Sequence, residues 1–553
     1  MKKLCGLLYL MMLSSLGYAQ NNQFLNPIIP GGYPDPSITK DDEYFYIVNS
    51  TFEYFPGLPI HRSKDLVNWE LIGHGLHREE QASGAVNLVD VRTNDGIHAP
   101  TMRYYNGVYH IISTNVYRGK NETQQTMVNF VITATDPEGP WSDPYVIEGA
   151  PGIDPDIFFD DNGDVWYIGQ GAARNPTFPG EGEIWIQQLN PKTWQLQGER
   201  HYLWTGACGG VWAEGPHMYK IDNTYYLLIA EGGTGHDHAV MIAQSDSPTG
   251  PFRSNPRNPI LTSRHLSYKY WVGKTGHGDL IQLKDGRWYM VALGVRTDVN
   301  GASNMGRETF MVPVDWELSD RNDLWPVVAP MSGKIDRHVE LPFKERPQYY
   351  QPQFSDDFES DTLNLQWNFR RVPEKGHFVL NPKESMLSIK TSPNLPKDQE
   401  RASFIGFRQT ETDFSYQARI EFTPEQERTE GGIMLMQKDN NYISYSVLKE
   451  QNQYFLQVAL AAPNKEREVL KKIKLQNYQG AIVLKVNSQF DRYEYSFAFD
   501  DAKEDQVMHT TTNDLLLYTG YTGAYLGLFT TSNGQPSSDT LDVDWVKYQG
   551  FIR

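Results

Sequence analysis

The sequence contains very little cysteine. Only Cys5 and Cys208 occur among 553 residues. Because Cys5 lies in a segment that we expect to be removed, the mature chain cannot form an intrachain disulfide. Its stability must therefore come from packing, and a chain of this length is expected to hold two or more domains with large cores.

Long apolar runs are also scarce. The one clear apolar stretch covers residues 4–16, after Lys2 and Lys3, and it is too short to span a bilayer. This pattern, followed by small residues, predicts a secretory signal peptide over residues 1–19 with cleavage before Gln20. We therefore expect a protein that is secreted across the inner membrane, resides in the periplasm and does not insert into the membrane.

Positive charge is in short supply. The chain has 50 Lys and Arg against 68 Asp and Glu, a formal net charge of −18, which becomes −20 when Lys2 and Lys3 leave with the signal peptide. This balance argues against nucleic acid or an anionic membrane as a partner. The substrate is expected to be neutral, because an anionic one would need a basic site to offset this field.

No long stretch shows the 3.6-residue period of an amphipathic helix. Instead the sequence is 13% aromatic and contains 46 Gly and 33 Pro, which is typical of many short strands joined by turns. Most of the aromatic side chains are expected to fill β cores. The surplus also suits sugar binding, because the CH-rich faces of sugars stack on aromatic rings.

One pattern recurs five times in the first part of the chain. Each unit begins with a carboxylate or an imidazole and continues through a turn into an aromatic-rich strand, and further strands follow. The five first residues, spaced by 63, 56, 60 and 63 positions, are Asp35, His98, Asp154, Glu214 and His277. This repeat predicts a five-bladed β-propeller over residues 20–340.

The pattern of residues changes after a connector at residues 341–353. Alternating apolar and polar residues recur from Phe354 onward, for example in residues 416–422 and 481–486. Such alternation without the earlier repeat predicts a separate β-sandwich over residues 354–553. The fold class is therefore expected to be all-β, with a propeller followed by a sandwich.

The five repeat residues are expected to meet at one pocket, because the innermost strand of each propeller blade begins near the central channel. Two carboxylates on opposite sides of a pocket suit glycoside hydrolysis, one as the base for a water and one as the acid for the leaving oxygen. The wide separation expected across a channel favours inversion, and a third carboxylate can raise the pKa of the acid. Taken singly, each residue could be an ordinary acid in a turn or an interior histidine. Because all five occupy the same position in their repeat units, a functional site is favoured.

Eight segments resemble glycoside hydrolase family 43. They are residues 26–38 (NPIIPGGYPDPSI), 50–57 (STFEYFPG), 63–69 (SKDLVNW), 152–155 (GIDP), 213–217 (AEGPH), 230–234 (AEGGT), 276–278 (GHG) and 306–309 (GRET). The C-terminal half resembles the concanavalin-like sandwich of this family's β-xylosidase and α-L-arabinofuranosidase branch. The resemblance implies that Asp35 is the general base, Glu214 the general acid, and Asp154 the carboxylate that tunes and orients the acid.

The same resemblance implies a substrate-binding set. Arg307 matches an arginine that binds substrate hydroxyls, and Phe52 matches an aromatic wall of the sugar pocket. His277 matches an axial histidine that often supports a central calcium ion through water, so a structural Ca²⁺ on the propeller axis is expected as the one candidate cofactor, with no organic cofactor. A second calcium site in the sandwich could be formed by four aspartates, but we favour the interpretation that they are solvated acids in turns. They are Asp356, Asp357, Asp542 and Asp544.

His98 departs from the family pattern. Family β-xylosidases often carry Val/Leu-Trp-Ala-Pro where this chain has IHAP at residues 97–100, so a hydrogen-bonding ring replaces a broad stacking surface. This favours an α-L-arabinofuranosidase. Closure of the pocket by a sandwich tyrosine, Tyr518 or Tyr521, would make cleavage exo-acting on a terminal pentose.

The expected function is therefore an exo-acting inverting hydrolase that releases terminal α-L-arabinofuranosyl groups from hemicellulose oligosaccharides of the arabinoxylan or xyloglucan type. A β-D-xylosidase or a bifunctional enzyme of the same family is the alternative. A non-catalytic carbohydrate-binding protein is the alternative of another class, and a propeller scaffold ranks last. The sequence leaves the polysaccharide, arabinan included, and the oligomeric state open.

Overall fold

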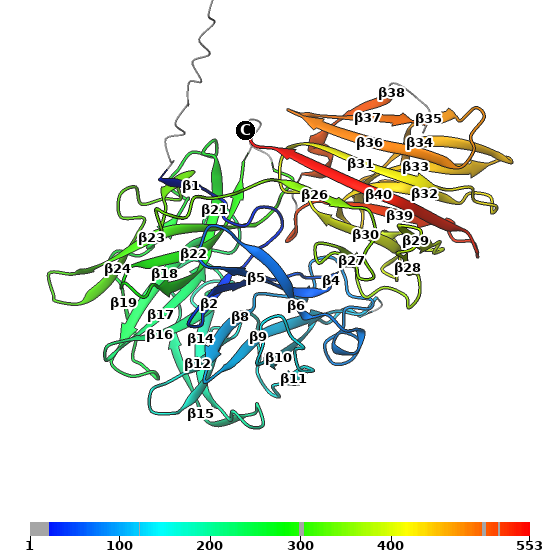
Figure 1. Ribbon diagram of the computed structural model, residues 1–553. Coiled ribbons are helices and arrows are strands. Elements are labelled where there is room, and N and C mark those ends of the chain that lie inside the picture. Colours follow the sequence, from blue (N-terminus) through cyan, green and yellow to red (C-terminus); the bar gives the residue numbers. More distant parts are fainter. Residues whose placement is uncertain (1–21, 121, 298–302, 500–504, 518–519) are drawn as a thin grey trace, which may run out of the picture.

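The computed structural model describes residues 22–120, 122–297, 303–499, 505–517 and 520–553, so the signal peptide predicted for residues 1–19 lies outside it. Apart from three short 3-10 helices, η1 (Glu79–Gln81), η2 (Pro396–Asp398) and η3 (Asn513–Leu516), the regular elements are all strands. They form two bodies that lie side by side (Figure 1). The all-β prediction is confirmed. No helix in this described part is long and apolar enough to cross a membrane.

Five antiparallel sheets form the propeller, which confirms the predicted number of blades. Blade 1 contains β2 (Ser37–Lys40), β3 (Phe45–Val48), β5 (Gly57–Ser63) and β6 (Glu70–Leu76). Blade 2 contains β7 (Gly96–Ile97), β8 (Thr101–Tyr105), β9 (Val108–Tyr117), β10 (Thr126–Ala134) and β11 (Tyr145–Val146). Blade 3 contains β12 (Asp156–Phe159), β13 (Val165–Ala172), β14 (Gly182–Leu189) and β15 (Leu196–Trp204).

The last two blades follow the same order. Blade 4 contains β16 (Glu214–Ile221), β17 (Thr224–Glu231), β18 (Ala239–Ser245), β19 (Arg253–Ser254) and β20 (Leu261–Thr262). Blade 5 contains β21 (Val272–Gln282), β22 (Trp288–Arg296), β23 (Glu308–Leu318) and β24 (Leu324–Val328). After blade 5 the chain returns to its start, where β25 (His338–Glu340) pairs with β1 (Gln23–Leu25).

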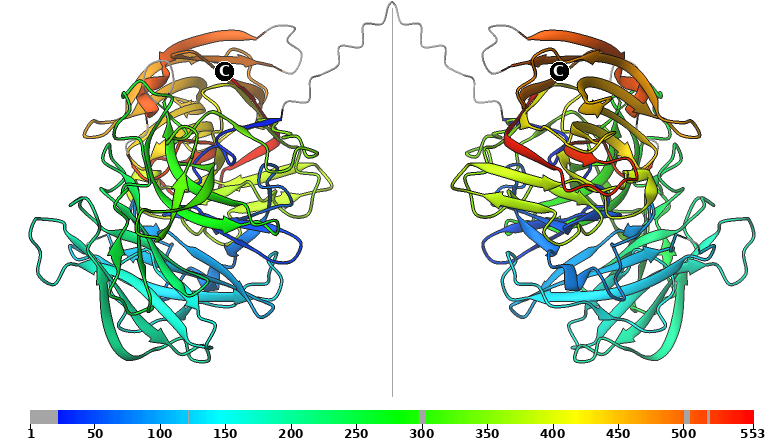
Figure 2. Two further views of the ribbon diagram at one scale, coloured as in Figure 1. Left: turned by 90° about the vertical axis from the view of Figure 1, so that its left-hand side faces the viewer. Right: turned by 90° about the vertical axis from the view of Figure 1, so that its right-hand side faces the viewer.

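The C-terminal body is a sandwich of two eight-stranded sheets, which Figure 2 shows above the propeller in yellow to red. One sheet contains β26 (Gln353–Asp356), β28 (Phe378–Asn381), β29 (Met386–Lys390), β31 (Asp413–Glu421), β36 (Ala481–Gln489), β37 (Arg492–Ala498), β38 (Gln506–Thr512) and β40 (Thr540–Phe551). The other contains β27 (Asn368–Arg370), β30 (Ser403–Arg408), β32 (Glu430–Lys438), β33 (Asn441–Glu450), β34 (Gln453–Ala461), β35 (Glu468–Lys474), β39 (Tyr525–Thr531) and β4 (Tyr54–Phe55).

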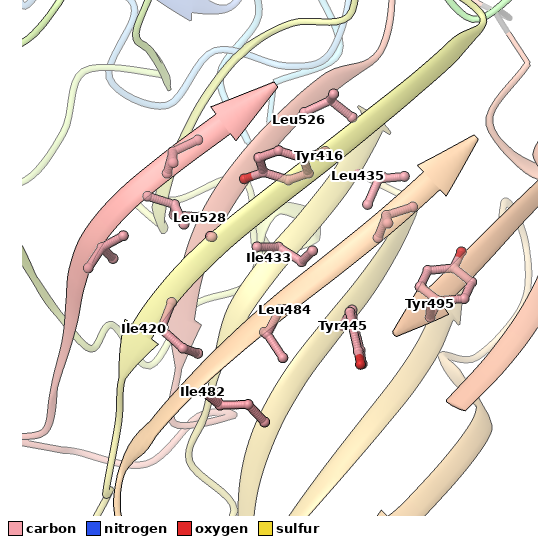
Figure 3. Close-up of a cluster of buried hydrophobic side chains, with 14 of the residues drawn as sticks. Tyr416, Ile420, Ile433, Leu435, Tyr445, Ile482, Leu484, Tyr495, Leu526 and Leu528 are labelled. Atoms are coloured by element: carbon pink, nitrogen blue, oxygen red, sulfur yellow. The ribbon is translucent and has the colours of Figure 1, made fainter. Parts of the chain in front are cut away.

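The sandwich core follows from the period of two in its strands. In β31 every second side chain is buried, including Tyr416 and Ile420, and β36 buries Ile482 and Leu484 in the same way. Figure 3 shows these side chains pointing into the space between the sheets. Each fully buried aliphatic side chain contributes about 1.5–3 kcal/mol relative to an exposed one, so this core can hold the domain together without a disulfide.

One strand of the propeller chain belongs to the sandwich. β4 leaves blade 1 and pairs with β27, with Phe55 opposite Phe369 and Tyr54 opposite Arg370. The two bodies therefore share a sheet through backbone hydrogen bonds. This shared strand starts two residues after Phe52, which places the junction beside the candidate pocket.

Candidate active site

A cavity of about 460 Å³ opens at the propeller mouth, and it brings together all seven residues that the sequence predicted to be catalytic or substrate-binding. Its lining also includes residues that the sequence did not single out. The complete lining is Asp35, Phe52, His98, Ile153, Asp154, Gln170, Trp212, Glu214, Gly232, Gly233, Thr234, Gly235, His277, Arg307 and Tyr521.

Unusual backbone conformations orient several of these side chains. Asp35, Phe52, Asp154 and His277 all have positive φ, between 47° and 56°. Such a conformation costs free energy for residues other than glycine, and it persists where the surroundings enforce it, often at functional sites. The sequence predicted that the repeat residues lie at the starts of their innermost strands. Glu214 is the first residue of β16, but His277 lies inside β21, where the pairing with β22 shifts register.

Asp35 is buried and lies beside a hydroxyl group and a guanidinium. Ser50 Oγ donates a hydrogen bond of 2.5 Å to its Oδ2, and Arg307 Nη1 lies 3.7 Å from its Oδ1. Burial alone would raise the pKa of Asp35, but His277, Arg307, the Ser50 hydroxyl and His98 together hold that pKa below its usual value. Asp35 is therefore ionised at neutral pH, the state that a general base requires.

Glu214, the first residue of β16, has the opposite character. Burial raises the pKa of Glu214 to about 7, with the negative charge of Asp35 adding to the effect and Arg307 opposing it. A carboxyl group with this pKa carries its proton over much of the range around neutrality. It is suited to donate that proton to a leaving group.

Asp154 lines the same pocket as Glu214, and the two carboxyl groups interact electrostatically. Burial raises the pKa of Asp154 well above its usual value, and the charges of Glu214 and Asp35 raise it further, against Arg307 and the N–H of Ala99. Because two like charges oppose one another, ionisation of either carboxyl group disfavours ionisation of the other.

One wall of the pocket is aromatic and is formed by residues of both the propeller and the sandwich. The rings of Phe52 and His98 meet edge to face with centroids 5.1 Å apart, and Tyr521 of the sandwich lies 5.1 Å from Phe52 and 6.0 Å from His98. Of the two tyrosines predicted to close the pocket, Tyr521 therefore reaches it, and Tyr518 lies outside the described residues. Burial lowers the pKa of His98 to about 4, so this wall is uncharged.

A buried ion cluster holds the backbone next to Phe52. Its neighbour Glu53 lies 2.7 Å from Arg370 Nη2, and Arg370 Nε lies 2.9 Å from Asp439 of the sandwich. Glu53 also accepts the N–H of Asn94 at 3.1 Å, and Asn94 Oδ1 accepts the N–H of Tyr521 at 3.0 Å. The same cluster thus positions two of the three rings of the wall, those of Phe52 and Tyr521.

A second cluster flanks Arg307. Glu308 lies 2.8 Å from Arg296 Nε, and Arg296 Nη1 lies 3.0 Å from Glu411 of the sandwich. Glu308 also accepts the N–H of Gly31 at 2.7 Å. Two residues of the pocket, Phe52 and Arg307, are therefore each followed in the chain by a buried glutamate that reaches toward the sandwich.

The side chains on the axis below the pocket do not fit the calcium ion that the resemblance implies. Ca²⁺ takes six to eight oxygen ligands, but the ring beside His277 is His217, with centroids 6.4 Å apart. The buried carboxylates Asp156 and Asp279 already pair with Arg103, at 3.0 and 3.1 Å. Within the described residues no cluster of three or more His, Cys, Asp or Glu could hold a metal ion.

Sequence reasoning missed several functional positions. It did not single out Ser50 or the segment 232–235, although Ser50 and residues 232–234 lie in segments that resemble the family. It also missed Trp212, for which the available signal was a bulky residue two positions before Glu214. Arg103 was missed as well, because only the assembled axis shows that its partners come from blades 3 and 5.

Comparison with known proteins identifies the family of the chain. The model for glycosyl hydrolases family 43 matches residues 24–321, and that of a β-xylosidase C-terminal concanavalin A-like domain matches residues 355–549. The chain belongs to glycosyl hydrolase family 43. The resemblance that the sequence predicted is thereby confirmed for both parts of the protein.

Three family members show how far the similarity extends. A xylosidase/arabinosidase of Butyrivibrio fibrisolvens is 35% identical, with 94% of this chain and 98% of the relative covered. The non-reducing end alpha-L-arabinofuranosidase BoGH43B of Bacteroides ovatus is 34% identical, with 99% of each chain covered. The crystal structure of a xylan beta-1,4-xylosidase from Bacillus halodurans superposes with a TM-score of 0.86 at 28% identity, over 95% of this chain and 100% of the other.

Proposed function

We propose that this family 43 glycosidase is an exo-acting, inverting enzyme that releases terminal α-L-arabinofuranosyl groups from hemicellulose oligosaccharides. One observation carries the proposal: a single pocket brings together Asp35 and Glu214, two of its three carboxyl groups, and gives them environments that shift their pKa values in opposite directions. The pKa of Asp35 is lowered, whereas burial raises that of Glu214 to about 7. A base and an acid are thus available together near neutral pH.

In the proposed reaction Asp35 accepts a proton from a water molecule as the water oxygen bonds to the anomeric carbon. At the same time the bond from that carbon to the leaving oxygen breaks, and Glu214 gives its proton to this oxygen. Asp35 and Glu214 stand on blades 1 and 4, which are not neighbours in a ring of five. This placement across the axis leaves room for a water, as inversion requires.

Asp154 and Arg307 support these two groups without taking part in bond making. The negative charges of Asp154 and Glu214 oppose each other, and the charge of Glu214 helps to raise the pKa of Asp154. Arg307 lies 3.7 Å from Asp35, and because a guanidinium does not lose its charge in this pH range it offers a fixed positive charge to the base and to substrate hydroxyls.

The closed aromatic wall supports exo cleavage and a preference for arabinofuranose. Tyr521 of the sandwich, Phe52 and His98 cover one side of the pocket, so a chain could not continue past a sugar bound there. His98 Nδ1 lies 3.2 Å from the Gly96 carbonyl and donates to it, which leaves Nε2 as an acceptor for a sugar hydroxyl. The BoGH43B relative, named as an arabinofuranosidase, supports the same choice.

A β-D-xylosidase activity is the second candidate, and it is favoured by the relative that is named for both activities. The deciding experiment compares release of 4-nitrophenol from the α-L-arabinofuranoside and from the β-D-xylopyranoside by the purified protein. A higher kcat/KM on the arabinofuranoside is expected. The reverse order would make the protein a xylosidase, and measurable binding without turnover of either would favour a carbohydrate-binding protein.

We further propose that the protein is exported and acts in the periplasm, on the basis of the basic and apolar pattern of residues 1–19. Fractionation of cells that express the full chain, with sequencing of the mature N-terminus, tests this. A mature protein that begins at Gln20 and is released with periplasmic markers is the expected result. A protein that keeps Met1 and stays with cytoplasmic markers would contradict it.

A further inference from the structure

Trp212 is the one tryptophan of the 13 in the chain, all within the described residues, whose side chain is exposed. Its exposed fraction is 56%, and it lines the same cavity as Glu214, two positions later in the chain. Exposure of so large an apolar ring is unfavourable unless something covers it. The ring therefore marks a place where a ligand with an apolar face would gain free energy by binding.

The backbone holds this ring in a conformation that a bulky residue rarely adopts. Trp212 has a φ of 54°, and such strain persists only where the surroundings enforce it. Its N–H donates to the carbonyl of Gly180 at 2.8 Å, and the preceding Val211 carbonyl accepts the N–H of Gly232 at 2.8 Å. Trp212 is thus fixed between a loop of blade 3 and a loop of blade 4.

Two further features are built around the ring. A Cβ atom on Gly233 would lie 2.4 Å from Cε3 of Trp212, so the indole packs directly on the glycine. The fully buried carboxylate of Glu231 accepts the N–H groups of Ala207, Cys208 and Gly210 at 2.9, 3.2 and 2.6 Å. Glu231 thereby fixes the loop that leads into Trp212, and acts on it as a positioning residue.

The position of Trp212 assigns it to the leaving-group side of the pocket. A general acid must come within about 2.6–3.2 Å of the oxygen it protonates, so the leaving sugar begins beside Glu214. The closed wall of Phe52, His98 and Tyr521 stands on blades 1 and 2 and the sandwich, whereas Trp212 belongs to the loop before blade 4. The terminal sugar and the rest of the substrate therefore have separate aromatic surfaces.

We propose that Trp212 is a stacking platform for the leaving group, and that this leaving group is a pyranose unit of a polysaccharide backbone. The proposal rests on the proposed glycosidase function and narrows its substrate. A pyranose with equatorial hydroxyls presents a flat face of C–H groups that can cover an indole, whereas a puckered furanose covers less of it. Arabinose or xylose linked to a pyranose backbone is thus favoured over linear arabinan.

The kinetic test compares substrates that differ only in the leaving group. The first pair is a xylo-oligosaccharide that carries one α-L-arabinofuranosyl group and α-L-arabinofuranosyl fluoride. The second pair is xylobiose and β-D-xylopyranosyl fluoride. Trp212→Ala should lower kcat/KM for the saccharides about tenfold more than for the fluorides. Trp212→Phe should recover most of the difference, and Gly233→Ala, which displaces the indole, should repeat the loss. Equal losses on both members of a pair, in variants whose thermal unfolding midpoint is unchanged, would overturn the proposal.

A second measurement needs no turnover. Because Trp212 is the exposed tryptophan, it should supply most of the fluorescence that iodide quenches, and saturating xylotriose should lower that fraction in the wild type but not in Trp212→Phe. If xylotriose protects Trp212 from quenching but no substrate is hydrolysed, the proposed function is wrong and the role of Trp212 as a platform stands. If xylotriose leaves the quenching unchanged while the enzyme still hydrolyses its substrates, the role of Trp212 as a platform is wrong and the proposed function stands.

Discussion

The guanidinium carbon of Arg307 lies 4.5 Å from the ring centre of Tyr521, so a propeller residue and a sandwich residue meet over the candidate base. A cation over an aromatic face is attracted to it, by about 0.5–2 kcal/mol depending on its exposure. Arg307 also lies 3.7 Å from Asp35. The pocket is therefore a joint product of two domains, and the sandwich contributes to its chemistry as well as to its shape.

The first prediction concerns the two carboxyl groups proposed to act on protons. Asp35→Asn and Glu214→Gln should each lower kcat on an arabinofuranosyl xylo-oligosaccharide by about 10²–10⁴-fold, the usual contribution of general acid–base catalysis. Glu214→Gln should lose less on an aryl glycoside, whose leaving group needs little protonation. Proton NMR of the wild-type product should first show the inverted anomer; initial retention would contradict the assignment of Asp35 as base.

The second prediction is the pH dependence of kcat/KM. The base must be ionised, and the pKa of Asp35 is lowered, so the acid limb should lie below the ordinary carboxyl range. The acid must be protonated, and burial raises the pKa of Glu214 to about 7, so activity should fall as pH rises through about 7. A kcat/KM that still increases above pH 8 would exclude Glu214 as the acid.

The third prediction concerns the contribution of the sandwich to the pocket. Tyr521→Ala removes the ring that covers Arg307 and Phe52, so KM for the aryl arabinofuranoside should rise, by about five- to tenfold for the loss of one aromatic contact. Tyr521→Phe keeps the ring and serves as the matched control. A KM that is equal in the wild type, the alanine variant and the phenylalanine variant would show that the sandwich does not shape the sugar site.

The fourth prediction concerns stability at the junction of the two bodies. Arg370→Met leaves Glu53 and Asp439 as buried charges without this partner, and loss of one member of a buried ion pair costs about 3–5 kcal/mol. A large fall in the urea midpoint is expected. The control is Lys64→Met, whose partner Glu43 is exposed and whose loss should leave the urea midpoint nearly unchanged. Equal midpoints for both variants would contradict the role given to Arg370.

The fifth prediction concerns metal removal. Arg103 already pairs with both Asp156 and Asp279 on the axis, so dialysis against a chelator should change neither kcat nor the thermal unfolding midpoint. Addition of calcium should change neither. A loss on chelation that calcium restores would show that the axis, or another part of the chain, holds the ion that the family resemblance implies.

Much of the fold was predictable because its signals are local and repeated. The intervals between Asp35, His98, Asp154, Glu214 and His277 predict five blades, and the two-residue period predicts the sandwich strands. The register of His277 was not predictable, because a bulge in β21 depends on its pairing with β22. β4 also escaped prediction, since its partner β27 lies more than 300 residues later.

The sequence by itself determined the blade repeat, the sandwich strands, the family and the identity of the carboxylates, because each of these depends on residue type and spacing along the chain. Only the tertiary structure decided how those carboxylates differ. Asp35 and Glu214 are both carboxylic acids, and their opposite pKa shifts come from burial and from charges on other blades. Tertiary contacts also place Tyr521 over Arg307, expose Trp212 at the pocket and fill the axis with Arg103. Such effects depend on distances in space that no spacing in the sequence encodes.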